Sequence, residues 1–229
     1  MKTLSKLTLL FLVVLAVSCK QSKDYKTVKT TDDNGYTYET VTGDELGARI
    51  YELKNGLKVY MAKNDDAPRL MTMIAVRAGS KNDPSDNTGM AHYFEHIMFK
   101  GTDEIGTVNW EKEKVLLDQI SDLYEKRKQT EDEQERLAIY KEIDSLSQIA
   151  AQYAVPNEYD KIVNVLGAEM TNAFTSKDVT AYMNDIPANE TERWLKIESE
   201  RFKDPVYRLF HTELETVYEE FNMSQDNDR

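Results

Sequence analysis

The chain has 229 residues, of which 40% are hydrophobic and 31% are charged, and its formal net charge at pH 7 is −12. This length and apolar content are sufficient to bury the core of one or two domains. Because nucleic acids bind proteins through clustered Lys and Arg, the acidic balance makes nucleic acid a poor partner.

Residues 1–18 have the pattern of a secretory signal peptide: a basic start is followed by an apolar stretch at residues 7–17 that is too short to span a bilayer. The string AVSC, which ends at Cys19, resembles a bacterial lipobox, in which the cysteine is lipidated and anchors the protein to a membrane. The alternative is an ordinary secretory signal with a chance cysteine. In either case we expect an exported protein of the bacterial cell envelope, periplasmic or held on the outer membrane. It has no internal disulfide, because Cys19 is the only cysteine.

The next predicted elements are strands. Residues 19–46 are polar, which predicts a tether with one short strand at residues 36–41. Residues 49–53 and 57–62 are two strand-like runs around Asn55-Gly56, which predicts a β-hairpin. The folded domain is therefore expected to begin at about residue 47.

Residues 70–76 form a further predicted strand, and both of its faces are mostly apolar, so we expect it to be the central strand of its sheet. A polar loop at residues 79–88 then leads into a helix that carries the string HYFEH.

The HYFEH string predicts a metal site. Two of the three histidines of the chain, His92 and His96, lie four residues apart with Glu95 between them. On a helix these three side chains share one face. Neutral imidazole suits Zn²⁺, which in catalytic sites has three protein ligands and one position for water. Glu95 is then expected to be the base that acts on this water, because H-x-x-E-H is the inverted form of the H-E-x-x-H zinc-peptidase helix.

Residues 110–154 are charged and free of Gly and Pro, with apolar residues at the 3/4 spacing of amphipathic helices. Thr130 followed by Glu133 is typical of a capping box that starts a second helix, so the segment is predicted to be a helical hairpin. It is either a lid or partner-binding arm, or an insertion that packs on the domain; we favour the second interpretation.

The rest of the chain predicts a short helix up to residue 166, strands at residues 170–175 and 179–186, and two more helices. The second of these begins with a predicted capping box of Thr212 and Glu215, and His211 before it is expected to be solvated. The predicted fold class is α+β, with a mixed or antiparallel sheet packed against helices and an inserted helical hairpin.

The last helix can supply the third zinc ligand. Stepping about 100° per residue places Glu213 and Glu220 one above the other at the edge of its apolar face, whereas Glu215 and Glu219 point away. Docking of the helix through its apolar face would therefore turn Glu220 inward. That face consists of Leu214, Val217 and Phe221.

At this point the sequence resembles the insulysin/pitrilysin family of inverted zinc metallopeptidases, in its bacterial members. The matching stretches are YELKNGLKVY, VRAGSKNDPSDNTGMAHYFEHIMFKGT, TNAFTSKDVTAYMNDIP and ELETVYEE, which run across nearly all of residues 49–220. The resemblance implies a zinc-dependent peptidase that holds one Zn²⁺ per chain through His92, His96 and Glu220, with Glu95 as the base.

The resemblance also implies roles that the residue pattern alone does not. Glu213 would support catalysis, and the strand containing Asn172 and Ala173 would pair with the backbone of a peptide substrate. Strand addition of this kind gives affinity without demanding one side-chain sequence.

The sequence departs from the family pattern in two ways. The 124 positions from His96 to Glu220 exceed the usual spacing by roughly the length of the helical hairpin, which we therefore interpret as an insertion. The chain also ends nine residues after Glu220, whereas family members enclose the substrate between two halves. We expect a C-terminal half, or a partner subunit, to complete the chamber.

The main functional hypothesis is a zinc-dependent endopeptidase acting on peptides or unfolded polypeptides. One alternative is an inactive or partner-dependent subunit of the family that acts in binding or assembly. Another is a lipid-anchored scaffold that recruits partners through the helical hairpin.

Overall fold

The computed structural model describes residues 25–226, and the chain divides into two compact units, Met1–Ala67 and Pro68–Arg229. The predicted signal peptide and Cys19 lie outside the described residues. Within the described range the chain combines antiparallel sheets with six α-helices, which confirms the predicted α+β class. No helix in this range has the length and apolar character needed to cross a lipid bilayer.

The strands are β1 (Thr27–Thr31), β2 (Thr37–Val41), β3 (Arg49–Glu52), β4 (Lys58–Met61), β5 (Arg69–Val76), β6 (Met170–Thr175) and β7 (Thr180–Pro187). The helices are α2 (Met90–Ile97), α3 (Trp110–Gln129), α4 (Glu133–Ala150), α5 (Glu158–Val165), α6 (Thr191–Lys203) and α7 (Phe210–Asp226), with short 3-10 helices η1 (Ser80–Asn82) and η2 (Ala188–Glu190).

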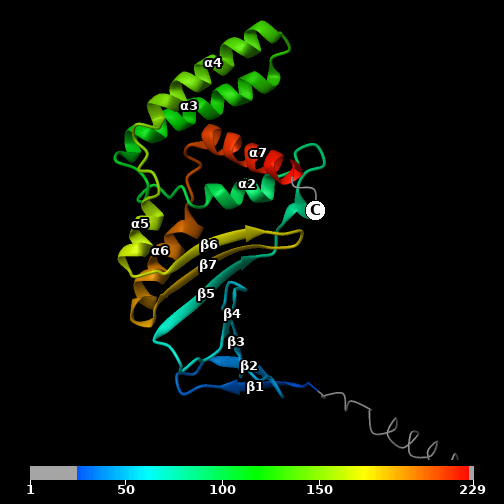
Figure 1. Ribbon diagram of the computed structural model, residues 1–229, viewed down its shortest axis with the longest axis vertical. Coiled ribbons are helices and arrows are strands. Elements are labelled where there is room, and N and C mark those ends of the chain that lie inside the picture. Colours follow the sequence, from blue (N-terminus) through cyan, green and yellow to red (C-terminus); the bar gives the residue numbers. More distant parts are fainter. Residues whose placement is uncertain (1–24, 227–229) are drawn as a thin grey trace, which may run out of the picture. The chain divides into compact units, whose positions relative to one another are not determined.

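The first unit is an antiparallel sheet in the order β1-β2-β3-β4 (Figure 1). β3 and β4 form the predicted hairpin, and Gly56 at its turn has a φ of +85°, which glycine adopts without a steric penalty. β2 matches the one strand predicted within residues 19–46.

β1 was not predicted, and it pairs with β2 over its whole length, from Thr27 opposite Val41 to Thr31 opposite Thr37. The described part of the predicted tether is therefore folded. Threonine and valine favour extended strands even where the segment is polar. The turn between the two strands is held by the Asp32 carboxylate, which accepts hydrogen bonds from two backbone N–H groups.

The second unit contains an antiparallel sheet in the order β5-β7-β6. Its central strand is β7, so the prediction that residues 70–76 form the central strand is wrong for this sheet. Side chains along β7 are mostly buried, whereas Met71 and Met73 of β5 are 63% and 58% exposed. An apolar sequence favours a strand, but the order of strands depends on pairing between segments more than 100 residues apart.

One face of β7 packs on α5 and α6 around a buried cation. The Arg201 guanidinium pairs with Glu198 and lies 4.6 Å from the ring centre of Tyr159 and 4.8 Å from that of Tyr182. Aromatic rings attract a desolvated cation through their negative faces. The Tyr159 hydroxyl donates to Glu198, which ties α5 to α6.

The predicted helical hairpin is present as α3 and α4, which pack on each other through Ile120, Ile139 and Ile143. The predicted capping box is wrong. Thr130 ends α3 and donates to the Lys126 carbonyl, and Asp132 instead caps α4 by accepting from the Glu135 N–H. The box predicted at Thr212 is also wrong, because α7 begins two residues earlier.

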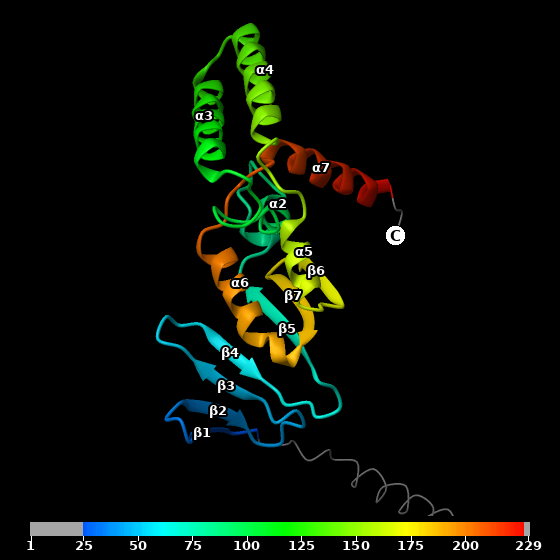
Figure 2. The ribbon, with the colours of Figure 1, turned by 90° about the vertical axis from the view of Figure 1, so that its left-hand side faces the viewer.

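Helices α2 and α7 lie side by side in the second unit (Figures 1 and 2). The Tyr93 hydroxyl of α2 donates to the Phe210 carbonyl at the start of α7 over 2.8 Å. Val217 of α7 is buried against Tyr93 and Ile97. These contacts bring the HYFEH helix and the glutamate-rich last helix together, although the two are over 100 residues apart in the sequence.

Candidate metal centre

Three predicted ligands meet between α2 and α7. One ligand atom each of His92, His96 and Glu220 lies within 4.8 Å of the others. The Glu220 Oε2 is 3.6 Å from His92 Nε2 and 3.5 Å from His96 Nε2. All three side chains are partly exposed, so solvent can reach the group.

These atoms fit a zinc ion. Tetrahedral Zn²⁺ with nitrogen and oxygen ligands at about 2.1 Å holds its ligand atoms roughly 3.4 Å apart. The Glu220 oxygen is 3.5 and 3.6 Å from the two histidine nitrogens, close to that value. Two imidazoles and one carboxylate are also one of the ligand sets found in catalytic zinc sites, which leave a fourth position for water.

Glu213 orients His96. The His96 Nδ1 is 3.4 Å from Glu213 Oε2, whereas its Nε2 faces Glu220. The other Glu213 oxygen, Oε1, is 2.5 Å from Lys100 Nζ. With Nδ1–H directed at a carboxylate, the lone pair of His96 is on Nε2, where a metal would bind.

These contacts also shift the pKa values of His96 and Glu213. The hydrogen bond to Glu213 raises the pKa of His96, with burial acting in the opposite direction. Burial favours a higher pKa for Glu213, but hydrogen bonds from His96 and Lys100 outweigh it, so the pKa of Glu213 lies below its ordinary value. Glu213 is therefore ionised at neutral pH, as an orienting carboxylate must be.

We expect Glu213→Gln to weaken zinc binding by about 10- to 100-fold, because an amide orients the imidazole less strongly than a carboxylate. Competition with a chromogenic chelator measures the affinity. Glu215→Gln is the matched control, since Glu215 is exposed on the same helix. Equal zinc affinity in the two variants would show that Glu213 does not act through His96.

Glu95 lies beside these residues but outside the group that could hold a metal. It is 7% exposed, and its Oε2 accepts a hydrogen bond from Thr175 Oγ1 at 2.5 Å. The helix that carries it is capped by Asp83, whose two carboxylate oxygens accept from the Gly89 and Ala91 N–H groups. Glu95 is thus held toward β6.

Asn172 and Ala173 lie in the middle of β6, which has β7 on one side and, in the described part of the sheet, no strand on the other. Asn172 is exposed, and its side-chain oxygen accepts from the Ala173 N–H. β6 is therefore an edge strand in the described sheet, as the predicted strand addition requires.

Two residues of the centre were not predicted. Lys100 follows His96 by four positions, and this spacing was a usable signal for a side chain near His96. Thr175 stands next to the predicted Asn172-Ala173 pair, but nothing in the sequence connects it with Glu95, 80 residues earlier.

The docking of α7 differs in part from the prediction. Val217 is buried as expected, whereas Leu214 and Phe221 are exposed. Glu220 is directed at the histidines, and Glu219 is exposed. The inward turn of Glu220 therefore rests on fewer apolar contacts than the helical wheel implied.

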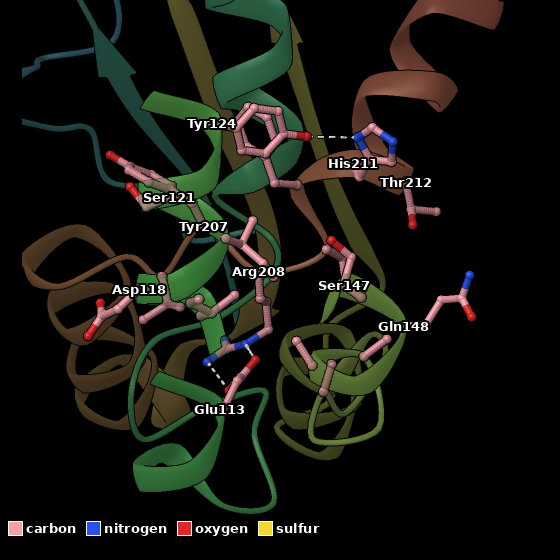
Figure 3. Close-up of a pocket in the computed structure, with 18 of the residues that line it drawn as sticks. Glu113, Asp118, Ser121, Tyr124, Ser147, Gln148, Tyr207, Arg208, His211 and Thr212 are labelled. Atoms are coloured by element: carbon pink, nitrogen blue, oxygen red, sulfur yellow. Dashed lines mark hydrogen bonds and ion pairs between the residues drawn. The ribbon is translucent and has the colours of Figure 1, made fainter. Parts of the chain in front are cut away.

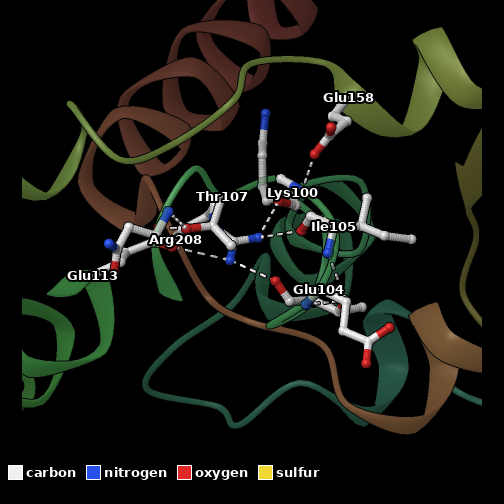
Figure 4. Close-up of polar contacts among 10 residues, drawn as sticks. Lys100, Glu104, Ile105, Thr107, Glu113, Glu158 and Arg208 are labelled. Atoms are coloured by element: carbon white, nitrogen blue, oxygen red, sulfur yellow. Dashed lines mark hydrogen bonds and ion pairs between the residues drawn. The ribbon is translucent and has the colours of Figure 1, made fainter. Parts of the chain in front are cut away.

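Arg208, just before α7, anchors the segment that leads into that helix. It is 1% exposed and forms a buried ion pair with Glu113 of α3, with Nε 2.8 Å from Oε1 (Figure 4). Its other N–H groups donate to three carbonyls of the loop that follows α2: those of Lys100, Thr102 and Ile105, at 2.7, 2.6 and 3.0 Å.

Gly101 and Gly106 give this loop room for the guanidinium. Both have positive φ, and a Cβ on either would lie within 2.9 Å of Arg208 Nη1. The two glycines thus allow the loop after α2 to pack closely around the Arg208 side chain.

His211 is not a solvated flank, as was predicted. Its Nδ1 is 2.9 Å from the Tyr124 hydroxyl of α3 and its Nε2 is 2.7 Å from the Tyr140 hydroxyl of α4. Beside it the hairpin and residues 204–212 line a cavity of about 820 Å³ (Figure 3). Together with Arg208, His211 ties the helical hairpin to the helix that carries Glu220.

The sequence and the fold are similar to those of known proteins. Residues 58–114 match the family described as Insulinase (Peptidase family M16). A segment of 49 residues is 41% identical to coenzyme PQQ synthesis protein F of Pseudomonas aeruginosa, covering 21% of this chain and 6% of that protein. A segment of 50 residues is 42% identical to a probable mitochondrial-processing peptidase subunit beta of Schizosaccharomyces pombe, covering 22% of this chain and 11% of that one.

The fold is similar to that of the first half of the periplasmic protease PqqL from Escherichia coli, with a TM-score of 0.54 and 18% sequence identity. The similarity covers 82% of this chain and 31% of that one. The chain thus corresponds to less than a third of this solved structure, and its matched segments are a small part of the two relatives.

Proposed function

This chain belongs to the insulinase/pitrilysin family of peptidases, peptidase family M16, and we therefore propose that it is a zinc-dependent endopeptidase acting on peptides or unfolded polypeptides. The observation that carries the proposal is the convergence of His92, His96 and Glu220. Proteases of this family are zinc-dependent. The same three residues are the ones that the family resemblance implies as ligands.

The residues around the ligands have distinct roles in the proposed reaction. A zinc ion held there would lower the pKa of water toward neutrality and polarise the substrate carbonyl. Glu95 takes the proton from the attacking water and delivers it to the leaving amine nitrogen. Glu213 keeps the Nε2 of His96 directed at the ligand group.

The peptide is proposed to bind as an added strand along β6, beside Asn172 and Ala173. Backbone hydrogen bonds would hold it whatever its side chains, and this suits an enzyme that accepts unfolded polypeptides. Support comes from the position of β6 at the edge of the described sheet and from its contacts with α2.

We further propose that the protein is exported to the bacterial cell envelope with a lipid on Cys19, and that a second half or a partner subunit completes the peptide chamber. The sequence of residues 1–19 supports export. One similar structure is that of the first half of a periplasmic protease, and another similar protein is named as a subunit.

We expect the purified protein to bind about one zinc ion per chain and to cleave an unfolded peptide, with chelation abolishing cleavage and added zinc restoring it. Elemental analysis measures the metal, and mass spectrometry of the products measures cleavage. Zinc binding without cleavage would favour the partner-dependent or inactive subunit. A protein that holds no zinc would overturn the proposal.

A further inference from the structure

The Glu95 carboxylate is held at one of its two oxygens. Within residues 25–226, the side chain that hydrogen-bonds to it is Thr175, whose Oγ1 is 2.5 Å from Glu95 Oε2. An ionised carboxylate only accepts hydrogen bonds, so the threonine hydroxyl is the donor. The contact fixes the rotation of the carboxylate and leaves Oε1 as the oxygen able to receive a proton.

Thr175 is itself rigidly placed. It is the last residue of β6 and pairs with Thr180, the first residue of β7. The Thr180 hydroxyl donates to the Ala78 carbonyl over 2.9 Å, and its oxygen lies 3.3 Å from Thr175 Oγ1. A β-branched side chain in a paired strand has few rotamers available. The hydroxyl of Thr175 is therefore directed at Glu95 by the backbone that carries it.

The turn after Thr175 is also joined to the segment that leads to α2. The Ser80 N–H donates to the Ser176 carbonyl over 2.9 Å, and the Lys81 N–H to the Lys177 carbonyl over 3.1 Å. Gly79 allows this approach, because a Cβ there would collide with the carbonyl of Ser176. Backbone hydrogen bonds therefore join the turn after β6 to the segment before the Glu95 helix.

We propose that Thr175 is a positioning residue for the general base, and that it aligns Glu95 with a peptide bound along β6. This inference rests on the proposed peptidase function. β6, the strand that would receive the peptide, ends at Thr175, the residue that orients Glu95. The six residues of β6 would therefore set both the register of the bound peptide and the direction of the Glu95 carboxylate. Misplacement of a catalytic group by about 1 Å can lower a rate by about 100-fold.

Three variants test this inference. Thr175→Val keeps the shape and removes the hydroxyl, and it should lower kcat by about 100-fold with KM and zinc content within about twofold of wild type. Thr175→Ser keeps the hydroxyl and should stay within about threefold of wild type. Thr72→Val is the matched control. It removes a buried threonine hydroxyl that donates to the Asn184 carbonyl in the same sheet, and its kcat should be unchanged.

A crystal structure of metal-free Thr175→Val gives a readout that does not depend on activity: the Glu95 carboxylate should rotate away from β6. Unchanged kcat in an active Thr175→Val protein would refute the inference and leave the peptidase function standing. If the wild type cleaves nothing, the proposed function fails, and the crystal structure still decides whether Thr175 holds Glu95. If Thr175→Ser and Thr72→Val lower kcat as much as Thr175→Val does, the role of Thr175 is structural only.

Discussion

Replacing Glu95 with glutamine is expected to leave zinc bound and to lower kcat by about 10²- to 10⁴-fold, the range over which general base catalysis contributes. Glutamine has the same shape and can still accept the Thr175 hydrogen bond, but it cannot take a proton from water. Glu95 is outside the group of metal-binding atoms, so the metal should stay. Cleavage of an unfolded peptide under saturating substrate measures the effect.

The control for this variant is Glu219→Gln, which changes an exposed carboxylate on α7 in the same way. Zinc content and thermal unfolding should be the same in both variants and in the wild type. Turnover of the Glu95 variant within tenfold of wild type would mean that another group removes the proton. Loss of zinc would instead place Glu95 among the ligands.

Replacing Glu220 with alanine is expected to remove stoichiometric zinc and to weaken the affinity on the order of 10³-fold, since one of three protein ligands disappears and structural zinc sites in small peptides bind the metal with about 10–16 kcal/mol in total. Glu220 is partly exposed, so the metal-free fold should be little affected. Equilibrium dialysis against buffered zinc measures the affinity.

Glu219→Ala is the matched control here, because it removes the neighbouring carboxylate from the exposed side of the same helix. It should bind zinc as the wild type does. If the two alanine variants bind zinc equally well, Glu220 is not a ligand, and the proposed centre loses the residue that distinguishes it from a pair of neighbouring histidines.

Local periodicity predicted much of the fold and of the centre. The 3/4 spacing in residues 110–154 gave both helices of the hairpin, and the helical wheel separated Glu220 from Glu219. Such patterns report which side of one element is apolar, and this depends only on residues within a few turns of each other.

Contacts between segments that are distant in the sequence could not be predicted from local periodicity. The Thr175 hydroxyl and Glu95 are 80 positions apart, and Glu113 and Arg208 are 95 positions apart. The place of β7 at the centre of its sheet likewise depends on its pairing with β5, which precedes it by more than 100 residues. The start of α4 was mispredicted for a different reason: Thr130 and Asp132 can both cap a helix, and the geometry of the loop selects Asp132.

The way α3 and α4 are attached limits how this protein can be shortened. Glu113, Tyr124 and Tyr140 all lie in the hairpin. Deleting the hairpin would leave the Arg208 guanidinium buried without its counter-ion, at a cost of about 3–5 kcal/mol. Only the tip around residue 130 can be trimmed without touching these anchors. Complete removal of the hairpin is therefore no clean test of a scaffolding role, because it would also remove contacts at the start of the helix that presents Glu220.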